Sequence, residues 1–134
     1  MPESFMRIGE VASRTELSLR SLRHWEEVGL LRPSGRTEGG FRLYTEADVD
    51  KILVIRRMKP LGFTLDQMRA VMDDLDVLEA AGEAAGEDPA GPAARAARSR
   101  LGDIHAEAVE RRARLERQLD MADEFLGLLD SRRD

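Results

Sequence analysis

The chain has 134 residues, with 21 Lys and Arg against 26 Asp and Glu, for a formal net charge of −5. Residues 1–72 carry 12 basic and 10 acidic side chains, so the acidic excess lies in residues 73–134. The absence of cysteine excludes disulfides, thiolate metal sites and iron–sulfur clusters. Because no apolar run resembles a signal peptide or a membrane span, we expect a soluble, cytoplasmic protein without membrane contact.

Two short helices are predicted near the N-terminus. The spacing of apolar residues indicates a first helix over Ile8–Arg14 and a second from Leu19 to about Val28. Ser18 is suited to cap the start of the second helix. Gly29 follows the last turn of that helix, where a left-handed backbone is common.

A β-hairpin is predicted next. The stretches Leu30–Pro33 and Phe41–Tyr44 flank residues 34–40, which contain three glycines. Two short apolar stretches around a glycine-rich segment are typical of a hairpin with a flexible tip.

Two capping boxes predict the starts of a third and a fourth helix. Thr45 and Asp48 form such a box with Asp in place of the usual Glu, and Thr64–Gln67 follows the usual pattern. Apolar residues recur at helical spacing after each box, and Pro60 and Gly62 separate the two helices.

The C-terminal half is predicted to be a linker followed by one long helix. Residues 79–98 are rich in Gly, Ala and Pro, although the alanines could extend a helix into either end. The long helix is expected from about Ser99 to Leu129, about 45 Å at 1.5 Å per residue. It carries an apolar seam with a seven-residue repeat, interrupted in its first half by His105 and Arg112. The apolar seam positions are Leu101, Ala108, Leu115, Leu119, Ala122, Leu126 and Leu129. Because this seam has no cover in its own small domain, we expect it to pair with a second subunit.

Basic side chains gather on the second predicted helix and on the hairpin. Those that share one helix face at spacings of three and four are Arg20, Arg23 and His24. Ser21 lies beside them, and Arg36 and Arg42 are on the hairpin. Arginine holds phosphate or guanine with two parallel hydrogen bonds. Two helices, a short turn and a hairpin in this order predict a surface that reads double-stranded DNA.

Three blocks in this order resemble the MerR family of bacterial transcription regulators. They are Ile8-Gly-Glu-Val-Ala12, the segment Leu17–Pro33, and Gly40-Phe-Arg-Leu-Tyr44. Leu61-Gly-Phe-Thr-Leu65 is similar to the second wing of the family and its following helix. The resemblance covers about residues 7–72. It implies a homodimer joined by an antiparallel coiled coil, which binds a palindromic promoter operator and bends and untwists it for RNA polymerase.

The resemblance also implies which residues contact DNA. On the recognition helix and at its end these are Arg20, Ser21, Arg23, His24 and Trp25. On the first wing they are Arg36, Phe41, Arg42 and Tyr44, and on the second wing Arg57 and Lys59. A lone tryptophan on a helix is as often a core residue, so packing remains an alternative for Trp25.

Three residues depart from the family pattern. Glu16 stands where the turn usually carries Gly or another small residue, so it is expected to alter the turn or to repel phosphate. His24 replaces a phenol, so one DNA contact is expected to weaken at high pH. Pro60 is expected to stiffen the second wing. No effector domain is expected after the long helix and the metal-loop cysteines of the family are missing, so the effector is unknown and no cofactor is predicted.

The resemblance and the patterns together predict a mostly α-helical fold with a small β-hairpin wing. We expect a winged helix-turn-helix domain over residues 1–78, a linker over 79–98, and a dimerisation helix over 99–134 that forms an antiparallel coiled coil. A bacterial, nucleoid-associated location in the cytoplasm follows from this interpretation.

The remaining charged clusters have simple interpretations. No metal site is expected, because the two histidines, His24 and His105, are far apart in sequence. The acidic run at residues 73–76 is typical of a solvated helix end. The basic cluster at residues 111–114 is expected to pair with the acids Glu107, Glu110 and Glu116 at helical spacing.

Other functions remain as alternatives. An enzyme is not expected, because no nucleophile, metal site or phosphate-binding loop accompanies the Glu26-Glu27 pair. A DNA-architectural or partner-recruiting protein without a small-molecule switch, and a protein-interaction module built on the long helix, both stay open. A ligand groove is conceivable, although ordinary helix packing is favoured for its lining residues, Met68, Met72, Leu75 and Leu78.

Overall fold

The structure is a computed structural model that describes residues 4–83 and 91–133. It divides into two compact units, Met1–Asp76 and Val77–Asp134. The first unit holds the two short N-terminal helices, the hairpin, a third helix and most of a fourth. The second unit is formed mainly by one long helix.

The first two helices confirm the sequence prediction. They are α1 (Ile8–Thr15) and α2 (Leu19–Glu27). The hydroxyl of Ser18 accepts the Ser21 N–H at 3.0 Å, which caps α2 as expected. Gly29 has φ 81°, a conformation that glycine adopts without steric cost.

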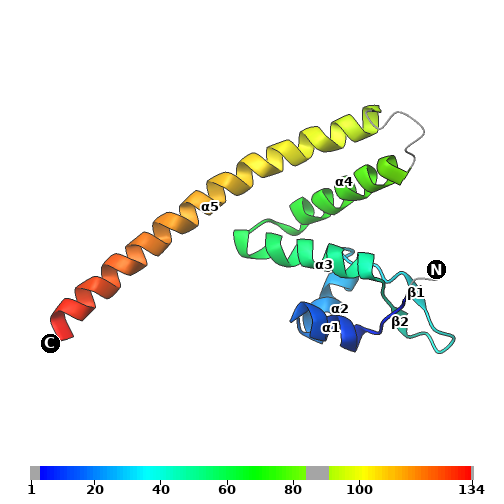
Figure 1. Ribbon diagram of the computed structural model, residues 1–134, viewed down its shortest axis with the longest axis horizontal. Coiled ribbons are helices and arrows are strands. Elements are labelled where there is room, and N and C mark those ends of the chain that lie inside the picture. Colours follow the sequence, from blue (N-terminus) through cyan, green and yellow to red (C-terminus); the bar gives the residue numbers. More distant parts are fainter. Residues whose placement is uncertain (1–3, 84–90, 134) are drawn as a thin grey trace. The chain divides into compact units, whose positions relative to one another are not determined.

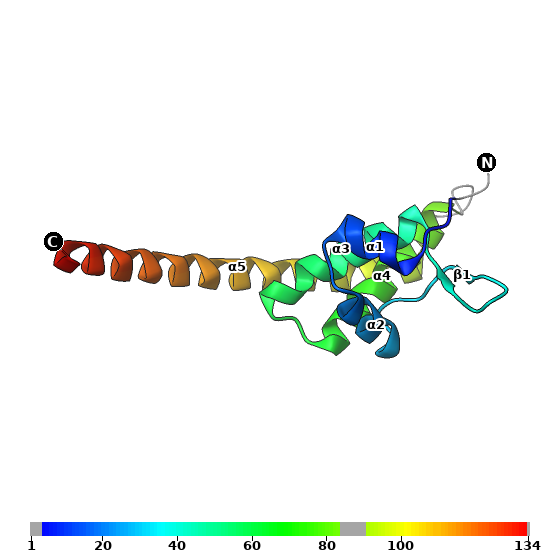
Figure 2. The ribbon, with the colours of Figure 1, turned by 90° about the horizontal axis from the view of Figure 1, so that it is seen from below.

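The wing is an antiparallel hairpin of β1 (Gly35–Arg36) and β2 (Arg42–Leu43). The loop between the strands extends away from the helices in both Figure 1 and Figure 2. Met6 and Tyr44 form an isolated bridge with two backbone hydrogen bonds of 2.8 Å. This bridge ties the start of the chain to the base of the wing.

The first strand does not lie where the sequence predicted it. It falls inside the expected tip, residues 34–40, and not in Leu30–Pro33. The N–H groups of Leu30 and Leu31 both donate to the carbonyl of Trp25, and both leucine side chains are buried. This stretch therefore closes the end of α2 and packs in the core, so it is not available to pair as a strand.

The third helix, α3 (Glu46–Met58), begins with the predicted capping box. The Thr45 N–H donates to Oδ2 of Asp48 at 2.9 Å, and the Asp48 N–H donates to Oγ1 of Thr45 at 3.2 Å. A short 3₁₀ turn, η1 (Lys59–Leu61), follows α3 and ends at Gly62, which has φ 79°. Both the box and the break after α3 are confirmed.

The second capping box is also confirmed. It starts α4 (Leu65–Glu83). The Thr64 N–H donates to Oε1 of Gln67 at 2.9 Å, and the Gln67 N–H donates to Oγ1 of Thr64 at 3.1 Å. Met68 and Met72 of α4 are buried, which supports ordinary packing for these two residues of the suggested ligand groove.

The core of the first unit is formed by the packed faces of α1, α2 and α3 together with the wing base. Helix α1 contacts both α2 and α3. The largest fully buried side chains are Tyr44, Leu22, Ile52, Ile55, Val11 and Thr15. Burying an aliphatic side chain of this size contributes about 1.5–3 kcal/mol.

In the second unit, α5 (Pro92–Arg133) is one uninterrupted helix, as Figure 1 shows. It begins seven residues before the expected start at Ser99, and its 42 residues span about 63 Å at 1.5 Å per residue. Proline fits the first turn of a helix because its missing N–H would have no partner there. The two helices thus occupy both ends of the predicted linker, whose centre, residues 84–90, lies outside the described residues.

The apolar side chains in the later part of α5 are exposed in the single chain. They include Leu115, Leu119, Leu126 and Leu129. The predicted pairing along the helix is confirmed for Arg111 and Arg112, which form ion pairs of 2.6 Å to Glu107 and 2.8 Å to Glu116. None of the helices within residues 4–83 and 91–133 has an apolar stretch that could cross a membrane.

Candidate nucleic-acid interface

The exposed face of α2 carries the basic residues singled out from the sequence. Arg20, Arg23 and His24 are exposed, and Ser21 is partly exposed beside them. Together with Lys59 from η1 they line one groove. The structure therefore places the predicted recognition helix and part of the predicted second wing on the same surface. Arg57, the other predicted residue of the second wing, is exposed near the end of α3.

Two of the predicted DNA contacts lie inside the fold. Trp25 is 3% exposed, with the ammonium of Lys59 5.9 Å from the centre of its ring. Tyr44 has no exposed surface. A direct contact with DNA does not fit a fully buried side chain, so Tyr44 lies beneath the wing surface. For Trp25 the burial favours packing, the alternative weighed from the sequence.

The wing arginines are paired with an acidic residue of the recognition helix. Oε1 of Glu26 lies 3.3 Å from Nη2 of Arg36, and its Oε2 pairs with Nε of Arg42. Arg36 and Arg42 face each other across the hairpin. A second nitrogen of Arg36 donates to the carbonyl of Gly40 at 3.1 Å. From the sequence, Glu26 is a candidate only for catalysis. That this one carboxylate at the end of α2 faces two wing cations becomes visible only in the fold.

An exposed aromatic side chain marks the edge of the wing. Phe41 is 57% exposed, and the guanidinium of Arg7 lies 4.4 Å from the centre of its ring. A cation at this distance from a ring face is attracted to it. Arg7 was not predicted as a surface contact, because it precedes the first helix and has no helical neighbour at fixed spacing.

Two arginines that are not among the predicted DNA contacts stabilise the positions of α1 and α2. Arg69 of α4 donates from Nε to the carbonyl of Val28 at 2.9 Å and makes a second bond to it through Nη2. Arg56 of α3 donates to the carbonyl of Thr15 at 2.6 Å. These bonds satisfy carbonyls at the C-terminal ends of α2 and α1, which lack partners within their own helices.

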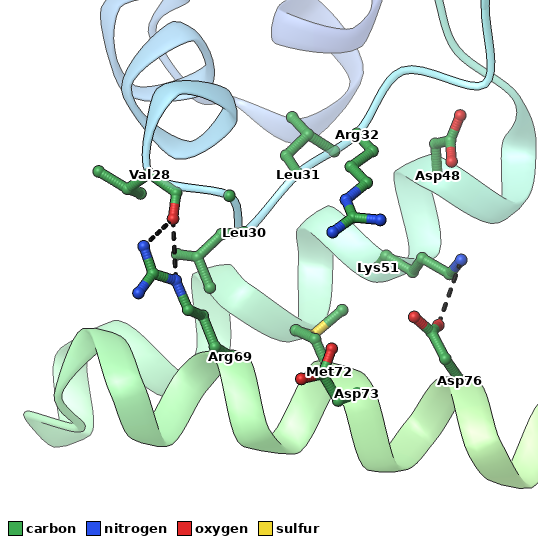
Figure 3. Close-up of a pocket in the computed structure, with 11 residues that line it drawn as sticks. Val28, Leu30, Leu31, Arg32, Asp48, Lys51, Arg69, Met72, Asp73 and Asp76 are labelled. Carbon is green, nitrogen blue, oxygen red and sulfur yellow. Dashed lines mark hydrogen bonds and ion pairs between the residues drawn. The ribbon is translucent and has the colours of Figure 1, made fainter.

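Figure 3 shows Arg69 reaching the end of α2 beside a cavity of about 360 Å³. The carboxylate of Asp76 in its wall pairs with Lys51 at 3.4 Å. Asp74, in the same acidic run, is buried, so this run is not uniformly solvated as the sequence suggested. No group of three His, Asp or Glu side chains suited to a metal ion occurs within the described ranges.

Three groups in the described part of the first unit have shifted pKa values: Tyr44, Glu46 and Arg14, whose pKa is raised by its hydrogen bond to Glu46. Burial, followed by the negative charge of Glu26, raises the pKa of the Tyr44 phenol above its usual 10.0. The hydrogen bonds from Arg14 lower the pKa of Glu46 below its usual 4.5. That guanidinium binds both carboxylate oxygens, at 2.6 and 2.7 Å, and joins α1 to α3.

Residues 6–75, slightly more than half of the chain, match the family model described as MerR HTH family regulatory protein. The chain belongs to this family. The family resemblance expected from the sequence is thereby confirmed, and the mostly helical fold with a two-stranded wing and a long C-terminal helix agrees with the expected fold class.

Relatives of known description each match about half of the chain. The nodulation protein NolA of Bradyrhizobium sp. (strain NC92) is 43% identical over 67 residues, which are 50% of this chain and 28% of that protein. The HTH-type transcriptional regulator CueR of Vibrio cholerae is 42% identical over 67 residues, 50% of this chain and 48% of CueR. The chain thus matches less than half the length of these relatives, which are described as regulators or nodulation proteins and not as enzymes.

Solved structures resemble nearly the whole chain. HiNmlR, a MerR family regulator lacking the sensor domain and bound to promoter DNA, has a TM-score of 0.66 at 21% identity, over 96% of this chain and 92% of that one. PbrR691 from Ralstonia metallidurans CH34, in complex with lead(II), has a TM-score of 0.54 at 27% identity, over 96% and 86%. At such identities these structures support the common fold.

Proposed function

We propose that the protein is a sequence-specific, double-stranded DNA-binding transcription regulator that acts as a homodimer on a palindromic promoter operator. The observation that carries this proposal is the exposed basic face of α2, where Arg20, Arg23 and His24 lie together while Leu22 and Trp25 pack into the core. A helix supported in this way can enter the major groove with its outer side chains toward the base edges.

The exposed seam of α5 supports the homodimer. Leu115, Leu119 and Leu126 are 44%, 62% and 56% exposed, and they repeat at the spacing of a coiled coil. A continuous stripe of leucines exposed to water is unfavourable, and it marks a surface that another surface covers. A second copy of α5, antiparallel to the first, would cover them and would place two recognition helices on one operator.

We further propose that the dimer bends and untwists its promoter in the bacterial nucleoid, so that RNA polymerase can use it. Bending and untwisting an operator costs several kcal/mol, and contacts between the wings and the phosphates would offset this cost. The family membership and the wing with its two arginines support this part of the proposal.

The test is selection of duplexes from a random pool by the full chain, followed by footprinting of the selected site. We expect a two-fold symmetric site. Failure to protect any palindromic duplex at low salt, where phosphate contacts are strongest, would refute the proposal.

A matched pair of variants then locates the surface. Arg23→Gln should weaken operator binding about tenfold or more, because a bidentate contact to a base contributes about 1–3 kcal/mol. Arg117→Gln makes the same charge change on an exposed site of α5 and should leave operator affinity within about twofold.

A further inference from the structure

Glu26 joins the recognition helix to the wing through two different ion pairs. Its side chain is 15% exposed. The pair of its Oε2 with Nε of Arg42 involves two atoms that are shielded from water. The pair with Arg36 is longer, at 3.3 Å, and the Arg36 side chain is 51% exposed. One carboxylate therefore makes a shielded contact with one wing cation and an open contact with the other.

These ion pairs change how much Arg36 and Arg42 contribute to the binding of a DNA duplex. Binding of a free guanidinium to a phosphate releases a condensed counterion, which makes affinity depend on salt. A guanidinium that already has a carboxylate partner must leave it first, and the freed carboxylate would then lie unpaired near the negatively charged DNA. Such a cation contributes little to binding unless the phosphate is well placed.

We propose that Glu26 is a specificity-determining positioning residue, which withholds Arg36 and Arg42 from the phosphates of non-specific duplexes and sets the wing at one angle to α2. The inference rests on the proposed DNA-binding function. Non-specific binding is almost entirely electrostatic, so withholding two cations weakens it more than it weakens binding to an operator with well-placed phosphates.

The test compares Glu26→Gln with Glu27→Gln in the full-length protein. Glu27 is the next residue of α2, is exposed and lines the groove of the basic residues, and neither wing arginine pairs with it, so its variant tests the loss of a charge at the same surface without loss of the wing contacts. The two variants make the same change in charge. The amide oxygen that Glu26→Gln introduces keeps a hydrogen-bond acceptor at this position, which favours retention of the fold.

The first measurement is the slope of log K against log salt on a duplex of unrelated sequence. We expect Glu26→Gln to steepen the slope by about one to two, because each additional phosphate contact adds about 0.9. It should also reduce the preference for operator over unrelated duplex about tenfold. Glu27→Gln should change the slope by less than about half of that amount.

A second comparison remains decisive even if Glu26→Gln does not fold. In the wild-type background, Arg36→Gln should scarcely change the slope on unrelated duplex, whereas Arg23→Gln should reduce it by about 0.9. If Glu26→Gln folds, Arg36→Gln in that background should also reduce the slope by about 0.9.

The outcomes separate this inference from the proposed function. Two results would overturn the role of Glu26 while leaving DNA binding intact. One is equal slopes for the Glu26 and Glu27 variants, and the other is a reduction of the slope by about 0.9 from Arg36→Gln in the wild type. A wild-type protein that binds no duplex would overturn both.

Discussion

Glu16 has φ 58° and ψ 29°, a left-handed backbone that otherwise occurs only at glycines among the described residues with positive φ. It ends α1 by donating its N–H to the carbonyl of Ala12, and the N–H of Leu17 donates to the same oxygen at 3.2 Å. The sequence identified Glu16 as a departure from a turn that usually carries a small residue. The structure gives the physical reason, which is steric conflict between a Cβ atom and the left-handed backbone.

Replacing Glu16 with glycine should therefore stabilise the protein. We expect Glu16→Gly to raise the free energy of unfolding by about 1 kcal/mol, measured by urea denaturation. Glu16→Ala is the control, since it removes the same charge but keeps the Cβ atom. An equal gain from both variants would show that charge, and not backbone conformation, is responsible.

Tyr44 is the second residue whose environment leads to a prediction. Its hydroxyl is buried without a hydrogen-bond partner within the described part of the chain. An unsatisfied buried hydroxyl costs about 1–3 kcal/mol, so Tyr44→Phe should be neutral or stabilising by about 1 kcal/mol at neutral pH. Operator affinity should not change, because the side chain has no exposed surface.

The same residue predicts a dependence on alkaline pH. Burial raises the pKa of Tyr44 in the folded state, so its contribution to stability is complete below the usual 10.0 and is lost as pH rises through the folded value. The wild type should lose more stability above pH 10 than Tyr44→Phe. Tyrosinate absorbance reports this group directly, because Tyr44 is the only tyrosine. Equal losses in both proteins would contradict the assignment.

At the scale of elements, side-chain caps decide where three of the helices begin. Ser18 starts α2, and the boxes Thr45/Asp48 and Thr64/Gln67 start α3 and α4. These starts could be predicted because a cap involves residues at most three apart, so sequence spacing is sufficient. The predicted position of the first wing strand is wrong, because the pattern of apolar residues does not show that the N–H groups of Leu30 and Leu31 bond to the carbonyl of Trp25.

Loss of the Ser18 cap should affect both stability and binding. Ser18→Ala should lower the free energy of unfolding by about 1 kcal/mol, since the Ser21 N–H loses its acceptor. Operator affinity should fall as well, because the start of the recognition helix frays. Ser13→Ala, an exposed change inside α1, should stay within about 0.5 kcal/mol of the wild type in thermal or urea denaturation.

At the scale of the whole molecule, the length and heptad pattern of α5 predict assembly. Leu101 of the seam is only partly exposed, whereas Leu115, Leu119, Leu126 and Leu129 are exposed on a helix of 42 residues, which is a long apolar stripe for an isolated chain. The proposed binding of two recognition helices to a palindromic operator would depend on this assembly. Dimerisation and operator binding should therefore be lost together.

A charge placed in the seam should separate the subunits. Leu119→Glu should reduce the mass measured by light scattering from that of two chains to that of one, because two charges would be buried at the seam. Ala106→Glu places the same charge on an exposed site outside the seam, about 140° around the helix from Leu119 at 100° per residue. It should leave the mass unchanged. A dimer that survives Leu119→Glu but not Ala106→Glu would place the interface on the other face.

The sequence by itself determined the features that depend on short spacing. These are the helices and their caps, the basic face of α2 with Arg20, Arg23 and His24, and the family. Only the tertiary structure decided which of the predicted contact residues are accessible. Tyr44 and Trp25 are buried. Arg56 and Arg69 donate hydrogen bonds to the carbonyl groups of Thr15 and Val28. It also placed Glu26 between Arg36 and Arg42, which are 10 and 16 positions away. The physical reason is that burial and ion pairing depend on the packing of elements distant in sequence, which no local pattern encodes.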